Sequence, residues 1–232
     1  MQKSAVAIPL ANFYLKSYKV QMLKKTNIYI VRHGQTDWNI QKKMQGRSDI
    51  PLNAKGEQQA QQTGINLKEQ GIQFDRVYSS PLCRTLKTAQ LISGFKEEQI
   101  IKEPRIIEFA FGKAEGATIE ERRTNPKLFN IRDFFLAPEL YRAAEDAETF
   151  EEVAERTKDF WQNEILPLED SPLKNILVVT HGGTLQSLLM HIDGRSLKDF
   201  WAVEFKNCSV NLVSLENGKF NLEWTSRVFY EE

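Results

Sequence analysis

Two apolar segments that each end in a histidine constrain this chain more than any other feature of its sequence. The segment IYIV, residues 28–31, runs into the triplet RHG at 32–34, and the segment ILVVT, residues 176–180, runs into HGG at 181–183. Short uninterrupted apolar runs of this kind predict fully buried strands. Because ligands bind at the carboxyl ends of strands in an open parallel sheet, we expect the two histidines to meet at one site.

Helical segments alternate with the predicted strands. Capping residues mark the helix starts, as in the capping box formed by Thr149 and Glu152. The expected helices run from Asn53 to about Gly71, from Ser80-Pro81 to about Ile92, from Thr149 to Leu166 and onward from Thr184. The other expected strands are Arg76–Ser79, a strand pair or edge region around Pro104, and a C-terminal hairpin that turns at Asn217-Gly218.

This alternation indicates a three-layer α/β/α domain with a mostly parallel central sheet, which we place at residues 27–232. Residues 117–147 interrupt the alternation. We expect them to form a short helical insertion that sits over the end of the sheet as a cap.

The balance of charges excludes a general attraction to polyanions. Lys and Arg together number 31, and so do Asp and Glu, so any anion site must be built locally, and neither nucleic acid nor a membrane is expected as a partner. The sequence contains no run of about 18 apolar residues, so no transmembrane helix is expected.

Cys83 and Cys208 lack the spacing of a disulfide or metal motif, which favours free thiols in a reducing compartment and hence a cytoplasmic protein.

The first 26 residues differ from the rest, because they contain lysines but no Asp or Glu. A transit peptide usually carries arginine, which this segment lacks, and the apolar core that a signal peptide needs is interrupted by Pro9 and Asn12. We therefore interpret residues 1–26 as an extension, with Met22 as the native start.

A third predicted strand, Arg76–Ser79, leads into a helix whose first turn carries Arg84. A cation in the first turn opposes the helix dipole, and an anion nearby would offset that penalty. The start of the helix near Thr184 offers backbone N–H groups that also suit an anion. Three elements thus bring two arginines and two histidines to one place, and the natural occupant is a phosphoryl group.

These residues lie in blocks that resemble the histidine phosphatase superfamily, also called the phosphoglycerate-mutase-like family. The RHG triplet, followed by Thr36 and Asn39, is similar to the family signature. The resemblance runs from about Asn27 to Trp224 and continues in order through PLNAKGEQQA (51–60), YSSPLCRTLKTA (78–89), EFAFGKAEG (108–116) and VVTHGG (178–183). One RHG triplet is a weak signal, but five ordered blocks are specific.

The resemblance implies a role for each matching residue. His33 would be the nucleophile that becomes phosphorylated. Arg32, Arg84 and His181 would surround the equatorial oxygens of the phosphoryl group and stabilise their charge. No metal ion is needed in such a scheme, because the arginines supply the positive charge. The three histidines also lack the spacing of a zinc site.

Glu108 matches the proton donor of the family, with Glu115 close by as a second carboxylate. It would protonate the leaving alkoxide and then accept a proton from the water that hydrolyses the phosphohistidine. The residues expected to bind the substrate are Asn39, Gln45, Gly46, Phe109 and Gly182, although Phe109 has packing in the core as its alternative.

Two departures from the mutases favour the phosphatase branch. The mutases resemble this chain up to Gly116 and then carry a long insertion with an arginine pair that grips phosphoglycerate. Here Arg122-Arg123 follows Glu108 closely and the cap is short. Gln45 stands where mutases tend to have a small hydroxyl residue. The cap mixes basic side chains with aromatic ones, so a substrate with further negative charge or an apolar body would fit.

We therefore interpret the chain as a metal-independent phosphomonoesterase of the histidine acid phosphatase type, without a cofactor, that acts on a small phosphorylated metabolite. The alternatives are a phosphoglycerate mutase and a non-catalytic module that binds phosphorylated ligands. The presence of both His33 and Glu108 speaks against the module. The sequence leaves open the identity of the substrate and whether the chain forms a homodimer.

Overall fold

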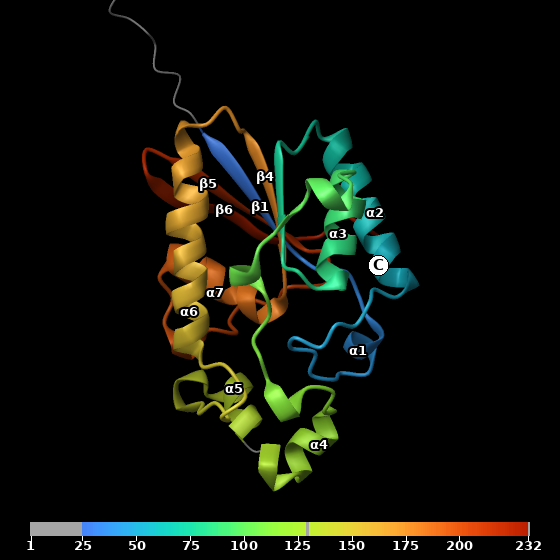
Figure 1. Ribbon diagram of the computed structural model, residues 1–232, viewed down its shortest axis with the longest axis vertical. Helices are drawn as coiled ribbons and strands as arrows, with labels where there is room; N and C mark the ends of the chain where they lie inside the picture. The colour runs from blue at the N-terminus through green and yellow to red at the C-terminus, as the bar shows by residue number, and fades with distance from the viewer. Residues whose placement is uncertain (1–24, 129, 232) are drawn as a thin grey trace, which may run out of the picture.

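In the computed structural model, which describes residues 25–128 and 130–231, six strands form one sheet (Figure 1). The strands are β1 (Thr26–Arg32), β2 (Arg76–Ser79), β3 (Ile101–Lys102), β4 (Asn175–Thr180), β5 (Val210–Glu216) and β6 (Lys219–Arg227). Their order is β3-β2-β4-β1-β5-β6, with parallel pairing from β3 to β1 and antiparallel pairing from β1 to β6. The mostly parallel sheet predicted from the sequence is confirmed.

Helices cover both faces of this sheet. The helices of the described residues are α1 (Asp37–Ile40), α2 (Ala54–Glu69), α3 (Cys83–Ser93), α4 (Ile119–Thr124), α5 (Asn130–Leu136), α6 (Phe150–Asp159) and α7 (Gly182–Asp193), of which α2, α3, α6 and α7 pack on the sheet. Figure 1 shows α6 and α7 on one face and α2 and α3 on the other. Short 3-10 turns occur at Glu97–Gln99, Pro104–Ile106, Gly112–Ala114, Pro126–Leu128, Pro138–Leu140, Leu166–Asp170 and Leu197–Asp199.

Strand β1 lies at the centre and packs against both helical layers. Ile28 and Ile30 belong to the core on the α6–α7 side, whereas Tyr29 and Val31 belong to the core on the α2–α3 side. Because successive side chains of a strand point to opposite faces, an unbroken apolar run is what burial on both faces requires. Arg32, the last residue of the strand, and His33, which follows it, therefore lie at the end of the sheet.

Two expected helix starts were wrong. Helix α3 begins at Cys83 with Leu82 as its N-cap, rather than at Pro81 with Ser80 as its N-cap, and Leu82 makes no side-chain capping bond. Helix α7 begins at Gly182, two residues before Thr184. Helix α6 ends at Asp159, and the chain continues as a π-helical turn over Phe160–Ile165 with Leu166 as its C-cap, so the helical segment as a whole ends where it was expected. The region around Pro104 holds only the two-residue edge strand β3.

The segment expected to form a cap contains α4 and α5 and lies beyond one end of the sheet (Figure 1). A dense aromatic cluster holds it together, with Phe134 in contact with Phe109, Phe111 and Phe150. The indole nitrogen of Trp201 donates a hydrogen bond of 2.7 Å to the carbonyl of Phe134 and ties the cap to the chain after α7. Residues 1–24 and Phe129 lie outside the described residues, as do the expectations that concern them.

Among residues 25–128 and 130–231, no helix has the length and apolar character needed to span a membrane.

We predict that Thr149→Ala lowers the free energy of unfolding by about 1 kcal/mol, the usual cost of losing an N-cap. The Thr149 hydroxyl accepts a bond of 3.1 Å from the Glu152 N–H, and the Glu152 carboxylate accepts one of 2.8 Å from the Thr149 N–H. Urea denaturation would measure the change, with Thr149→Ser as the matched control that keeps the hydroxyl. Equal losses in both variants would contradict the capping role.

Candidate active site

His33 lies directly after β1 and offers one ring nitrogen for chemistry. Its Nδ1 lies 2.7 Å from the carbonyl oxygen of Gly34, and since a carbonyl only accepts, Nδ1 carries the proton. The other nitrogen, Nε2, is therefore unprotonated. The ring is 3% exposed and lines a pocket of about 300 Å³. A neutral nitrogen with a free lone pair at a pocket is the form that a nucleophile needs.

Gly34 is required because two backbone segments meet there. A Cβ at this position would lie 2.5 Å from the carbonyl oxygen of Gly56, near the start of α2. The Gly34 N–H donates a bond of 3.0 Å to the Thr88 hydroxyl of α3. The glycine of the RHG triplet thus lets α2 and α3 approach the end of β1, which fixes the backbone that carries His33.

Arg84 is the central cation of the site and is completely buried. Its two terminal nitrogens donate bonds of 2.7 Å to the carbonyls of Gly46 and Ser48, and its Nε lies 3.3 Å from Nδ1 of His181. Burial lowers the pKa of Arg84 to about 10, so the group remains charged at neutral pH. The loop at 45–48 therefore wraps around the guanidinium group and leaves one side of it to the pocket.

Arg32 flanks His33 in the pocket lining. One terminal nitrogen donates a bond of 2.6 Å to the carbonyl of Phe205. Its Nε is buried and makes no hydrogen bond within the described part of the chain. Gly182 lies beside it, since a Cβ there would be 3.6 Å from that Nε. An oxyanion in the pocket would satisfy the nitrogen that the protein leaves unpaired.

The environment of the two active-site histidines keeps both of them neutral. Burial, followed by the charges of Arg84 and Arg32, holds the pKa of His33 well below its ordinary value. Burial and the charge of Arg84 lower the pKa of His181 in the same way. Positive neighbours disfavour an imidazolium, and this is the protonation state that attack by nitrogen requires.

His181 is buried beside Arg84, directly after β4. Its Nδ1 accepts a bond of 3.3 Å from Nε of Arg84, and its Nε2 lies 2.7 Å from the hydroxyl of Ser80. The centre of its ring lies 5.3 Å from the centre of the His33 ring. Direct contact between His181 and phosphate oxygens stays a prediction.

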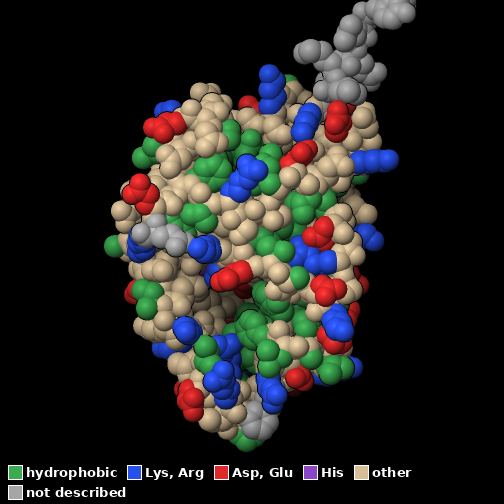
Figure 2. Space-filling model, turned by 180° about the vertical axis from the view of Figure 1, so that it is seen from behind, with side chains coloured by type: hydrophobic (Ala, Val, Ile, Leu, Met, Phe, Trp, Pro, Cys, Tyr) green, Lys and Arg blue, Asp and Glu red, His purple; other side chains and the backbone are tan. Residues whose placement is uncertain are grey.

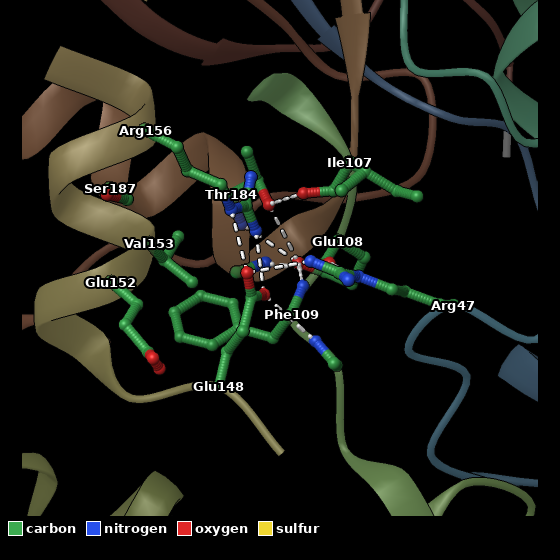
Figure 3. A network of polar contacts seen from close by, with 12 residues as sticks. Arg47, Ile107, Glu108, Phe109, Glu148, Glu152, Val153, Arg156, Thr184 and Ser187 are labelled. Atoms are coloured by element: carbon green, nitrogen blue, oxygen red, sulfur yellow. Dashed lines mark hydrogen bonds and ion pairs between the residues drawn. The ribbon is translucent and has the colours of Figure 1, made fainter. Parts of the chain in front are cut away.

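Glu108 projects toward the start of α7 (Figure 3). Its carboxylate accepts bonds of 3.1 Å and 3.0 Å from the N–H groups of Gly183 and Thr184, and a bond of 3.1 Å from the Thr184 hydroxyl. The positive helix end that we expected to bind phosphate thus holds this carboxylate instead. Glu108 also lines the pocket that holds His33.

A second set of ionic contacts fixes the surroundings of Glu108 (Figure 3). Arg47 donates bonds of 3.3 Å to the Glu108 carbonyl and 2.7 Å to the Glu148 carboxylate. Arg156 of α6 forms two bonds of 3.1 Å to the same Glu148 carboxylate. Sequence reasoning did not find these residues, because no local pattern distinguishes them from surface charges.

Most of the expected binding residues line the pocket, namely Asn39, Gln45, Gly46 and Gly182. Asn39 uses its side-chain oxygen to accept a bond of 2.9 Å from the Thr36 N–H, which leaves its amide nitrogen for a ligand. Phe109 does not line the pocket. It is fully buried in the aromatic cluster of the cap, so its packing role prevails.

Most of the outer part of the pocket was not predicted. Its lining residues come from the loop after α1, the chain just before and within the cap, α7 and the segment after α7: Lys43, Met44, Phe111, Phe134, Phe135, Gly183, Gln186, Trp201, Val203, Glu204 and Phe205. Five of them are aromatic, so an apolar group of a ligand could pack there.

Within residues 25–128 and 130–231, no group of three or more His, Cys, Asp or Glu side chains is placed to hold a metal ion.

A free imidazole nitrogen beside two guanidinium groups, with a carboxylate nearby, is the arrangement that phosphoryl transfer to histidine requires. A model of the histidine phosphatase superfamily (branch 1) matches residues 28–227, and the chain belongs to this superfamily.

Relatives in this superfamily include both phosphatases and mutases. The chain is 36% identical over 170 residues to the uncharacterized phosphatase PhoE of Bacillus subtilis, covering 73% of this chain and 78% of that one. It is 30% identical over 200 residues to the 2,3-bisphosphoglycerate-dependent phosphoglycerate mutase of Enterococcus faecalis, covering 75% and 87%. The solved structure of Bacillus stearothermophilus YhfR superimposes with a TM-score of 0.78 at 30% identity, covering 88% and 98%.

We predict that His33 and His181 are both neutral at pH 6 and have opposite tautomers, with the proton on Nδ1 in His33 and on Nε2 in His181. The Gly34 carbonyl and the Arg84 N–H impose these two states. Nitrogen-15 NMR of histidine-labelled protein would show them, with His191→Gln used to assign the third signal. A midpoint near 6.5 for either ring, or the same tautomer in both, would contradict the geometry.

Proposed function

We propose that this chain is a phosphomonoesterase that acts on a small phosphorylated metabolite through a phosphohistidine at His33. The observation that carries the proposal is the unprotonated Nε2 of His33 at the pocket, held by the Nδ1 contact to Gly34 and flanked by Arg32 and Arg84. The two free thiols of Cys83 and Cys208 support a cytoplasmic location, because free cysteines are typical of a reducing compartment.

In the proposed first step, Nε2 of His33 attacks phosphorus and forms an N–P bond while the ester P–O bond breaks. Arg32 and Arg84 stabilise the charge that spreads over the equatorial oxygens, and they supply what a metal ion supplies in other phosphoryl-transfer enzymes. The leaving alkoxide takes a proton from Glu108, which lines the same pocket.

In the second step, water attacks the phosphohistidine. Glu108, now a carboxylate, accepts the proton of the water, the N–P bond breaks, and inorganic phosphate is released. The bonds from the N–H groups of Gly183 and Thr184 hold the carboxylate in place when it is charged. His181 acts in both steps through Arg84, whose Nε it orients.

A mutase is the second candidate, because the mutase of E. faecalis is a relative. The placement of Arg122 and Arg123 favours the phosphatase. In this chain both residues line a separate hollow on the cap and neither lines the pocket that holds His33. Among the described residues, the only arginines that line this pocket are thus Arg32 and Arg84, which leaves no second pair for the carboxylate of a phosphoglycerate.

We predict that His33→Ala reduces phosphate release by a factor on the order of 10⁴ or more, since the nucleophile is lost. The assay uses a panel of phosphomonoesters in EDTA, and His191→Ala is the matched control because His191 lies outside the pocket and bonds to Thr157. Near-normal turnover in His33→Ala would refute the phosphohistidine.

The same assay separates the two candidate activities when 3-phosphoglycerate is tested with and without 2,3-bisphosphoglycerate. Release of phosphate that persists in EDTA supports the phosphatase. Isomerisation with little release assigns the mutase, and binding without either reaction assigns a non-catalytic module.

We predict that Glu108→Gln slows hydrolysis of alkyl phosphates about 10²-fold or more but slows hydrolysis of p-nitrophenyl phosphate far less, because nitrophenolate leaves without a proton. Glu115→Gln is the control. The Glu115 carboxylate accepts bonds from the N–H groups of Arg47 and Ser48 and should affect both substrates alike. Equal slowing of both substrates in Glu108→Gln would argue against a proton donor.

A further inference from the structure

The cap contains a second hollow, of about 340 Å³, between α4 and α5. Three arginines line it, Arg122 and Arg123 from α4 and Arg132 from α5. Apolar side chains form the rest of its walls, including Ile119, Phe135 and Leu136. Figure 2 shows basic and apolar side chains gathered side by side at the cap end of the face it presents.

The arginines of this hollow have no acidic partners. Among the described residues, none of the three forms an ion pair with Asp or Glu. In the same chain, Arg105 contacts three carboxylates. Since Lys and Arg equal Asp and Glu in number, the cluster is a local excess of positive charge and not part of a generally basic protein.

Arg122 is held rigidly at the inner side of the hollow. It donates a bond of 3.2 Å to the carbonyl of Lys42 and contacts Met44 Sδ at 3.2 Å, and its guanidinium group lies 5.3 Å from the centre of the Phe135 ring. Burial, followed by the charge of Arg123, lowers its pKa. An anion in the hollow would compensate both the burial of the Arg122 charge and its repulsion by Arg123.

The helix dipole explains only part of this arrangement. Arg122 and Arg123 lie in the last turn of α4, where a cation is favoured. Arg132, however, is the third residue of α5, near the helix start, where a cation is disfavoured. The dipole also gives no reason for Leu136 to be 72% exposed and Phe135 38% exposed beside the charges.

We propose that this hollow is a binding site for a small organic anion that carries a phosphate, sulfonate or carboxylate group on an apolar body. The arginines would hold the charged group, and Ile119, Phe135 and Leu136 would cover the body. Inorganic phosphate would leave the apolar walls exposed to water, and a neutral apolar molecule would leave the charges unpaired. A hollow of this size is in the range of small-molecule sites.

Phe135 links the hollow to the catalytic pocket, because it lines both. On the pocket side its ring lies 5.4 Å from the ring of Trp201. The anion is therefore either a separate molecule bound next to the pocket or the far end of an extended substrate whose phosphate lies at His33. The second case rests on the proposed function, and the first does not.

The test is calorimetric binding of 1-octanesulfonate, which the enzyme cannot hydrolyse, to the full chain. Removal of two exposed charges in Arg123→Gln/Arg132→Gln should weaken binding about fivefold to tenfold. Arg122 is left intact because it also supports the loop at Lys42 and Met44. Arg142→Gln, which removes an exposed cap arginine outside the hollow, is the matched control and should bind like the wild type.

Added salt should weaken binding to the wild type, because exposed charges are screened within about 10 Å at 0.1 M. Repeating the titration in saturating inorganic phosphate then distinguishes binding in the hollow from binding in the pocket beside His33. Binding that persists shows that the sulfonate lies in the hollow, whereas binding that is lost places the sulfonate at the phosphate position beside His33 and contradicts the proposal. Equal affinity of the wild type and the double variant, or equal binding of neutral 1-octanol, would overturn the proposal whether or not the chain is a phosphatase.

Discussion

The buried guanidinium group of Arg84 is the interaction on which the site depends. A buried charge costs several kcal/mol unless hydrogen bonds and opposite charge compensate it. Here two carbonyls and one imidazole nitrogen supply the bonds, and within residues 25–128 and 130–231 no carboxylate forms an ion pair with it. The positive charge is thus held in place but only partly compensated. An anion in the pocket would complete the compensation.

The same group determines the states of its neighbours. Because Arg84 donates to Nδ1 of His181, that ring must carry its proton on Nε2, where it faces Ser80. Burial, reinforced by the positive charges of Arg84 and Arg32, lowers the pKa of His33 and keeps the ring neutral. The bonds that Arg84 donates to the carbonyls of Gly46 and Ser48 hold the loop at 45–48 against the site. One side chain of α3 therefore links a protonation state, a tautomer and a loop conformation.

The parts of the fold that could be predicted from sequence are those with local causes. The apolar runs before His33 and His181 gave two central strands, because burial on both faces requires unbroken apolar residues. The Asn53 side chain caps α2 as expected, accepting a bond of 2.9 Å from the Gly56 N–H. The Asn217-Gly218 turn between β5 and β6 was also predicted, since both residues have the positive φ that such a turn needs.

The parts that could not be predicted depend on residues distant in the chain. The start of α3 was misplaced because Ser80 looks like an N-cap locally, whereas its hydroxyl contacts His181, 101 residues away. Phe109 was expected to line the pocket, but its ring packs against Phe134 and Phe150, which lie 25 or more residues further along the chain. The aromatic outer pocket joins Phe135 to Trp201, which no spacing rule connects.

Arg47 gives the cap an additional property. Its backbone N–H is bound by Glu115 and its guanidinium group by Glu148, and these two carboxylates stand just before and just after the insertion at 117–147. The insertion is therefore fastened at both of its stems to the loop that encloses Arg84. Neither contact uses a residue of the insertion itself, so substitutions within residues 117–147 would leave both contacts of Arg47 in place.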